Sequence, residues 1–166
     1  MYDVYILQEG KILALRNIVK LGDDILRKVC RTQLTFDDRL AMILNDMADT
    51  MYHAEGVGLA APQIGILRRY CIVDVGDGII ELINPVIEKQ SGSQDGEEGC
   101  LSIPGRYDCV TRPMKVKVRA QDRNGKTFTI TAEGFKARAI CHEIDHLDGI
   151  LYIDKISKKS DSEVNK

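Results

Sequence analysis

The feature that most restricts the fold is a pair of histidines, His142 and His146, with Glu143 between them. At the helical period of 3.6 residues the two histidines lie about 40° apart on one face, and Glu143 flanks that face. The opposite face is apolar and carries Ala137, Ile140, Ile144 and Leu147. The sequence therefore predicts a helix from about residue 133 to 147, with an apolar face in the core and a polar face available for chemistry.

Two imidazoles one turn apart can share a metal ion, and a neighbouring carboxylate can act as general base on a water at that ion. A single buried histidine is more often satisfied by hydrogen bonds alone. The chain has only three histidines, and two of them occupy this spacing with Glu143 between them. The pattern favours a metal-dependent hydrolase over a structural role for the histidines.

A catalytic site of this kind usually has three protein ligands and one open position. The remaining histidine, His53, falls near the end of a separate predicted helix. The position of the third histidine in the longer metzincin pattern holds Tyr152, and the acidic candidate further along, Glu163, lies in a polar tail. None of these three is a good ligand, so we expect the third ligand to come from upstream.

Cysteine is the remaining ligand type, and the chain has five. Cys141 is adjacent to His142 and therefore points about 100° away from the metal face. Cys100 follows a glycine and two acidic residues in a segment that we interpret as a loop, residues 96–102, and it is the favoured third ligand. The others are predicted to be core or helix-end residues: Cys30, Cys71 and Cys109.

The chain has 166 residues, 44% hydrophobic and 29% charged, which is ordinary for one globular domain. A net charge of −2 gives no indication of a nucleic-acid or membrane surface. There is no secretory signal pattern at the N-terminus and no apolar run long enough for a membrane span, so we expect a cytoplasmic protein. The predicted domain covers 12–156. It lies between a poorly patterned leader (1–11), which could be non-native, and a flexible polar tail (157–166).

Helices are also predicted over residues 23–30 and 36–55, with Thr35 as N-cap of the second. Strands are predicted over residues 70–75, 79–84, 107–110, 115–122 and 126–131, where the hydrophobic period shortens to two. Asn124-Gly125 indicates a tight hairpin between the last two strands. Because helices and hairpins are segregated along the chain, the fold class is expected to be α+β.

Three segments together resemble the motifs of the peptide deformylase family, bacterial type: Gly56–Gln63, Glu98–Ser102 and His142–Leu147. The resemblance extends from about residue 15 to 153. It implies small antiparallel sheets around a central metal helix, with a helix nearer the N-terminus, and hydrolytic removal of the formyl group from N-formylmethionyl proteins. It also strengthens Cys100 as the third ligand. The family usually has glutamine where this chain has Cys141.

The resemblance implies an oxyanion site formed by the Gln63 side-chain amide and the Leu101 backbone N–H, and Glu98 as the partner of a metal-bound histidine. A supporting ion pair between Arg112 and Asp145 is an open expectation. From the helical pattern we expect a methionine pocket with the Arg138 stem along its wall and the Arg138 head in water. The pocket residues are Val57, Gly58, Phe135, Arg138 and Ala139.

One thiolate and two imidazoles suit several divalent ions: Fe²⁺, which the family typically uses, or Zn²⁺, Ni²⁺ or Co²⁺. The expected partner is the N-formylmethionyl nascent chain at the ribosome, bound by a monomer without direct nucleic-acid or membrane contact. An endopeptidase of the zincin type remains an alternative, although no third His or Glu ligand is apparent. A structural metal site is a further alternative, but it would normally have four ligands. A degenerate deformylase is disfavoured because every motif residue with a catalytic role is present.

Overall fold

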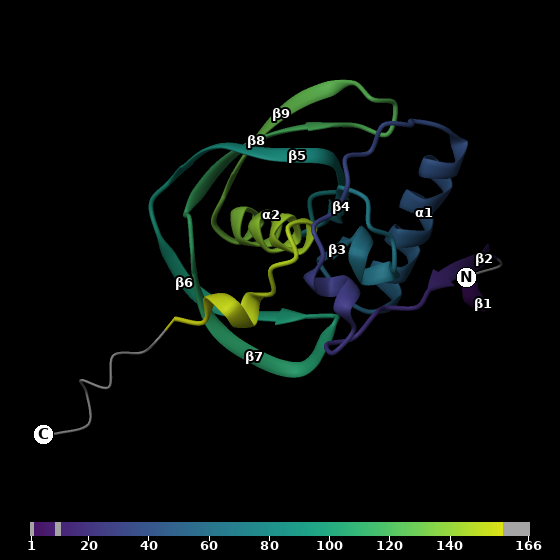
Figure 1. Ribbon diagram of the computed structural model, residues 1–166, viewed down its shortest axis with the longest axis horizontal. Helices are drawn as coiled ribbons and strands as arrows, with labels where there is room; N and C mark the ends of the chain where they lie inside the picture. The colour runs from purple at the N-terminus through teal and green to yellow at the C-terminus, as the bar shows by residue number, and fades with distance from the viewer. Residues whose placement is uncertain (1, 9–10, 158–166) are drawn as a thin grey trace, which may run out of the picture.

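The computed structural model describes residues 2–8 and 11–157, with side chains from residue 14 onward. It has two α-helices, three short 3₁₀ helices and nine strands (Figure 1). The helices are α1 (Asp38–His53), α2 (Gly134–Leu147), η1 (Asp24–Arg27), η2 (Ala61–Ile64) and η3 (Tyr152–Lys155). The strands are β1 (Tyr2–Gln8), β2 (Lys11–Arg16), β3 (Gly58–Ala60), β4 (Tyr70–Val73), β5 (Ile80–Ser91), β6 (Gln94–Cys100), β7 (Ile103–Arg112), β8 (Lys115–Gln121) and β9 (Thr127–Glu133).

The strands form three antiparallel sheets. Five strands make the main sheet, in the order β3-β4-β5-β8-β9, and the pairs β1-β2 and β6-β7 make two separate hairpins. All the registered pairings are antiparallel. Two α-helices with antiparallel sheets confirm the predicted α+β class.

Helix α2 lies at the centre of the molecule, between the main sheet and the β6-β7 hairpin (Figure 1). Its apolar face is fully buried, as the period of 3.6 predicts, and packs into a core with residues of β4, β8 and β9. A second core lies between α1 and the strands β3, β4 and β5. The two cores fix α2 relative to the sheet, and the polar face of α2 is left toward β6-β7.

The first long helix begins at Asp38, two residues after its predicted start at residue 36. Its N-cap is Asp37, whose side chain accepts a hydrogen bond from the Leu40 N–H at 2.9 Å. Thr35, the expected N-cap, therefore precedes the helix. The short helix expected over residues 23–30 is only the 3₁₀ turn η1, capped by the Asp23 side chain. Both differences concern helix ends, where capping side chains decide the boundary.

The largest difference from the predicted strands is the β6-β7 hairpin. Residues 96–102 are predicted to be a loop, and glycine and acidic residues are unfavourable in strands, but residues 96–100 belong to strand β6. This strand pairs along its length with β7, which begins at Ile103 rather than Tyr107. Strand β5 likewise continues to Ser91. The hairpin predicted at Asn124-Gly125 is present, since β8 pairs with β9.

The leader also has more regular structure than expected, since β1 pairs with β2 in antiparallel register. The predicted tail begins with Ser157, whose N–H donates to the Cys109 carbonyl at 2.9 Å. Residues 158–166, the rest of that tail, lie outside the described residues. Within the described part of the chain, neither α-helix has the length and apolar character needed to span a bilayer.

Candidate active site

Three side chains from two elements converge on one point. His142 and His146 come from α2, and Cys100 comes from the last position of β6. One ligand atom from each lies within 4.8 Å of the other two, and Cys100 Sγ is 3.3 Å from His146 Nε2. The structure thus brings together the three residues that the sequence predicts as metal ligands.

The chemistry of these donors fits a divalent transition metal. Glu98 accepts from His142 Nδ1 at 2.9 Å, which leaves Nε2 of that ring as the ligand atom. Burial lowers the pKa of His146 well below its usual value, so this imidazole is neutral, as a ligand must be. Among the described residues no fourth His, Cys, Asp or Glu joins the group. Three protein ligands are typical of a catalytic site rather than a structural one.

The surroundings of His142 favour positive charge. Burial alone would lower its pKa, but hydrogen bonds to Cys100 and Glu98, with the nearby charge of Glu143, raise the pKa to about 10. For Glu98, burial would raise the pKa, yet hydrogen bonds from Arg112 and His142 bring it down to about 2. Glu98 and Glu143 therefore stabilise a cation at His142, whether a proton or a metal ion.

Glu98 is held by two buried arginines. Arg112 donates to both carboxylate oxygens at 2.8 Å and also pairs with Asp145, the expected ion pair. Arg138 donates to Glu98 Oε1 at 2.9 Å. The expectation that the Arg138 head lies in water is wrong, because the residue is only 5% exposed. Its guanidinium is satisfied by protein acceptors instead, which compensates its burial.

Glu143 follows His142 on α2 and is also buried. Burial raises the pKa of its carboxyl to about 7. Its Oε2 has no hydrogen-bond partner among the described residues. Gly58 makes room for this side chain, since a Cβ at that position would lie 2.4 Å from Glu143 Oε1. A carboxyl group with a pKa near neutrality can both accept and return a proton.

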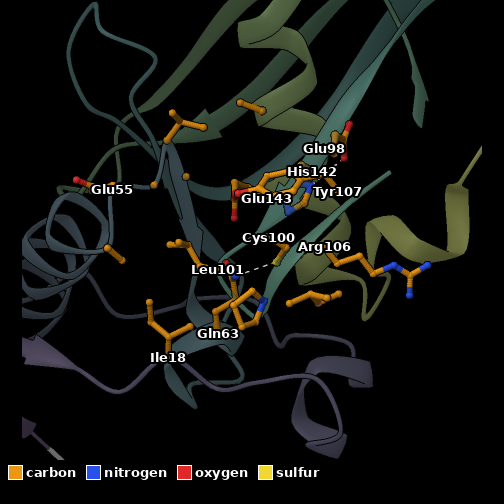
Figure 2. A pocket seen from close by; sticks show the side chains of 18 of the residues that line it. Ile18, Glu55, Gln63, Glu98, Cys100, Leu101, Arg106, Tyr107, His142 and Glu143 are labelled. Carbon is orange, nitrogen blue, oxygen red and sulfur yellow. Dashed lines mark hydrogen bonds and ion pairs between the residues drawn. The ribbon is translucent and has the colours of Figure 1, made fainter. Parts of the chain in front are cut away.

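The amide of Gln63 is fixed at both ends. Its Oε1 accepts from the Ala60 N–H at 2.8 Å, and its Nε2 donates to Ser102 Oγ at 3.1 Å. The same Nε2 contacts Cys100 Sγ at 3.4 Å (Figure 2). Nε2 is therefore directed toward Cys100, one of the three predicted ligands. Leu101 follows Cys100 in the turn between β6 and β7. The sequence reasoning missed Ser102, whose position two residues after Cys100 was the only available signal.

A cavity of about 550 Å³ opens onto these groups. All five residues predicted for the methionine pocket line it, as do Gln63, Cys100, Leu101, His142 and Glu143 (Figure 2). The sequence reasoning missed Tyr107, which lies on the cavity wall. A Cβ on Gly99 would come within 2.5 Å of the Tyr107 ring, so the glycine beside Cys100 is required for space. Its backbone φ is not in the left-handed region.

The residues rejected as ligands lie elsewhere. His53 is exposed at the end of α1. Tyr152 is buried with its ring stacked on His142, centroids 5.9 Å apart, and its hydroxyl donates to the Arg106 carbonyl. Cys141 packs in the core behind α2, where burial raises the pKa of its thiol to about 11. Glu163 lies outside the described residues.

A sequence model of the polypeptide deformylase family matches residues 15–162, almost the whole chain. The chain belongs to the polypeptide deformylase family. Members of this family are metal-dependent hydrolases that remove N-formyl groups from nascent peptides, which confirms the family and the enzymatic activity expected from the three motifs.

Curated relatives and solved structures agree with this assignment. The peptide deformylase of Caldicellulosiruptor bescii is 56% identical over 144 residues, covering 87% of each chain. That of Clostridium botulinum is 55% identical over 147 residues, covering 89% of this chain and all of the relative. The crystal structure of peptide deformylase from Thermotoga maritima superposes with a TM-score of 0.85 at 42% identity, covering 86% of this chain and 98% of the other.

A further solved structure carries a ligand. The peptide deformylase of Synechococcus elongatus, in complex with actinonin, superposes with a TM-score of 0.84 at 41% identity and covers 87% of this chain and 80% of the other. Together the structural matches confirm the deformylase fold expected from the motifs.

Proposed function

We propose that this deformylase releases formate from N-formylmethionyl termini with Cys100, His142 and His146 as metal ligands and Glu143 as general base and acid. The observation that carries the proposal is the convergence of a thiol, two imidazoles and a buried carboxyl group on one cavity. A divalent metal held by the three ligands would supply Lewis-acid activation of water and of the formyl group.

Glu143 moves the proton. Its carboxylate removes a proton from the water that attacks the formyl carbon, and the same proton goes to the leaving amine nitrogen when the C–N bond breaks. A pKa of about 7, raised by burial, lets the group act in both directions near neutral pH. The free amine and formate are then the products.

Gln63 and Leu101 would stabilise the oxyanion that develops on the formyl oxygen, through the Gln63 amide N–H and the Leu101 backbone N–H. The support for Gln63 is its preorganisation: Ala60 and Ser102 hold the amide so that its donor nitrogen is directed at the ligand group. Such donors require no reorientation during the reaction, which is the condition for effective oxyanion stabilisation.

The methionine side chain would lie in the cavity against Val57, Gly58, Phe135, Arg138 and Ala139. Strand β3 is an edge strand of the main sheet, since only β4 pairs with it among the described strands. Its free edge suits an extended peptide that adds as a further strand. The backbone of the substrate would thereby be aligned with its formyl end at the metal.

The metal in the cell would be Fe²⁺, with Zn²⁺, Ni²⁺ or Co²⁺ as possible substitutes, because one thiolate and two imidazoles bind all of them. Ferrous iron beside a thiolate is sensitive to oxygen, so a purified sample can carry a substitute. We further propose a cytoplasmic monomer, organised as one catalytic domain over 12–156, that meets its nascent-chain substrate at the ribosome without binding nucleic acid or membrane directly.

The test is formate release from a formyl-Met peptide by protein reconstituted anaerobically with Fe²⁺. Glu143→Ala should abolish turnover with metal still bound, and parallel loss of metal would contradict the base role. Gln63→Leu should lower kcat by about 10²- to 10³-fold with the fold intact. Near-normal activity of that variant would remove Gln63 from the oxyanion site. Cleavage of internal peptide bonds would instead indicate the endopeptidase alternative.

A further inference from the structure

We propose that Arg138 is a positioning residue that fixes α2 against the β6-β7 hairpin, so that the thiol and the two imidazoles are in place before the metal binds. The inference rests on the proposed metal site. It assigns Arg138 a second role, because the residue also lines the cavity predicted to receive the methionine side chain.

The need for such a residue follows from where the ligands lie. The histidines belong to α2, whereas Cys100 belongs to β6, and β6-β7 is a separate two-stranded sheet. No ladder of backbone hydrogen bonds joins this hairpin to the main sheet within the described strands. Backbone contacts of β7 with Ile156 and Ser157 tie the hairpin only to the segment after η3, so the relative position of thiol and imidazoles depends largely on side-chain contacts between α2 and the hairpin.

Arg138 makes the most extensive of these contacts. Its Nη1 lies 3.1 Å from the Gly96 carbonyl and 2.9 Å from the Val110 carbonyl, and its Nη2 donates to the Gln94 carbonyl at 3.1 Å. One guanidinium thus binds the backbone of both β6 and β7. A planar group with several fixed donors is suited to this, and a lysine ammonium is not.

The same guanidinium is connected through Glu98 to His142, a proposed metal ligand. Arg138 Nη1 donates to Glu98 Oε1 at 2.9 Å, and Glu98 Oε2 accepts from His142 Nδ1 at 2.9 Å. Arg112 approaches the carboxylate from β7 and pairs with Asp145 on α2. Arg138 reaches from α2 to the hairpin, and Arg112 reaches from the hairpin to α2. Of these two contacts within the described residues, that of Arg138 also includes strand carbonyls. Loss of its guanidinium should loosen the hairpin that carries Cys100 and the carboxylate that orients His142.

Gly96 provides an independent indication that the guanidinium has a defined place. A Cβ at Gly96 would lie 3.1 Å from Arg138 Nη2 and 3.2 Å from its Cζ. The backbone φ of Gly96 is outside the left-handed region, so an alanine there is acceptable to the backbone. The glycine therefore leaves room for the arginine head, and Gly96→Ala shifts that head by a few tenths of an ångström without removing its charge.

The first measurement is the Zn²⁺ dissociation constant of Arg138→Met, obtained by competition of the loaded protein with a chelator. Methionine keeps an unbranched apolar stem on the cavity wall but has no donors. The constant should rise about 10- to 100-fold, the usual effect of losing a partner that orients a ligand. Arg119→Met, an exposed arginine on β8 paired with Glu88, is the matched control and should bind Zn²⁺ as the parent does.

The helix should remain docked in Arg138→Met, because Gln94 Nε2 separately donates to the Gly134 carbonyl at the start of α2 at 2.7 Å. Far-UV circular dichroism and the melting temperature of the metal-free protein check this. With Co²⁺ as probe, the thiolate charge-transfer absorption should weaken in Arg138→Met, since Cys100 is the ligand on the loosened element.

The second measurement is a double-mutant cycle with Gly96→Ala. In the parent, this substitution should raise the Zn²⁺ dissociation constant several-fold by displacing the guanidinium. In the Arg138→Met background it should have no effect, because the group that it displaces is gone. A general loss of stability would instead act equally in both backgrounds.

Parent-like Zn²⁺ affinity in a folded Arg138→Met, or an equal effect of Gly96→Ala in both backgrounds, would overturn the proposal. Neither measurement depends on turnover. A chain that binds Zn²⁺ through Cys100 and yet releases no formate would refute the proposed function. The double-mutant cycle would still test the role of Arg138, because it measures Zn²⁺ binding alone.

Discussion

Gly58→Ala tests the position of the general base. The new Cβ would lie 2.4 Å from Glu143 Oε1, 2.7 Å from Cδ and 2.8 Å from Cγ, all far inside van der Waals contact. The backbone at Gly58 is in strand β3 and not in the left-handed region, so alanine adds no backbone strain. The substitution therefore acts on the Glu143 side chain.

The magnitude follows from that overlap. The carboxylate must retreat by about 1 Å to restore ordinary contact. A displacement of this size in a catalytic group costs about 100-fold in rate, or about 2.7 kcal/mol in activation free energy. The three atoms nearest the new methyl group all belong to Glu143, so metal affinity should be unchanged. We expect kcat for formate release to fall about 100-fold with one metal ion still bound.

The assay is steady-state formate release with metal content measured on the same sample. The control is Gly58→Ala in a Glu143→Ala background, where the clash is absent and the substitution should lower the melting temperature less than in the parent. A kcat within threefold of the parent would refute the reasoning. Loss of metal from Gly58→Ala would show instead that the methyl group disturbs the ligands.

Three further predictions concern stability and thiol reactivity. Arg112→Met removes one partner each from the buried Glu98 and the half-buried Asp145 and should destabilise the fold by about 1.5–3 kcal/mol in urea titrations, whereas a loss under about 1 kcal/mol would contradict the network. Burial raises the pKa of the Tyr70 hydroxyl to about 12, so the free energy of unfolding should fall as pH rises from about 10 to about 12, where the unfolded chain loses this proton and the folded chain keeps it. Tyr70→Phe should flatten that decline in the free energy of unfolding, and an unchanged slope would refute the prediction. Burial also raises the pKa of Cys30 to about 11, so iodoacetamide at pH 8 should label the half-buried Cys109 before Cys30, and faster labelling of Cys30 would contradict its burial.

The metal helix could be predicted because its evidence is local. His142 and His146 repeat at a helical spacing, and the apolar positions of the same segment share the opposite face, so period and chemistry agree. The motif around Gln63 was identified from resemblance, but its amide geometry was not. That geometry depends on Ala60 and Ser102, and Ser102 is distant in sequence from Gln63.

The position of the Arg138 head could not be predicted from the helix alone. An arginine beside an apolar slot is usually solvated at its tip, because burial of a guanidinium is costly without acceptors. Here the acceptors are carbonyls of β6 and β7 together with Glu98. Since β6 was itself interpreted as a loop, no array of acceptors was foreseen, and one missed strand led to the wrong environment for the arginine.

The missed strand does have the period of two that a strand requires, but its repeating side is polar. Gln94, Gly96, Glu98 and Cys100 alternate along β6, and each contacts α2. Hydrophobic alternation identifies a strand only when its inward face packs on an apolar core. Here the inward face meets the polar side of α2, so its residues are those that bond a buried arginine and complete a metal site. Because the inward residues of β6 are polar for the sake of these contacts, hydrophobic alternation does not identify the strand.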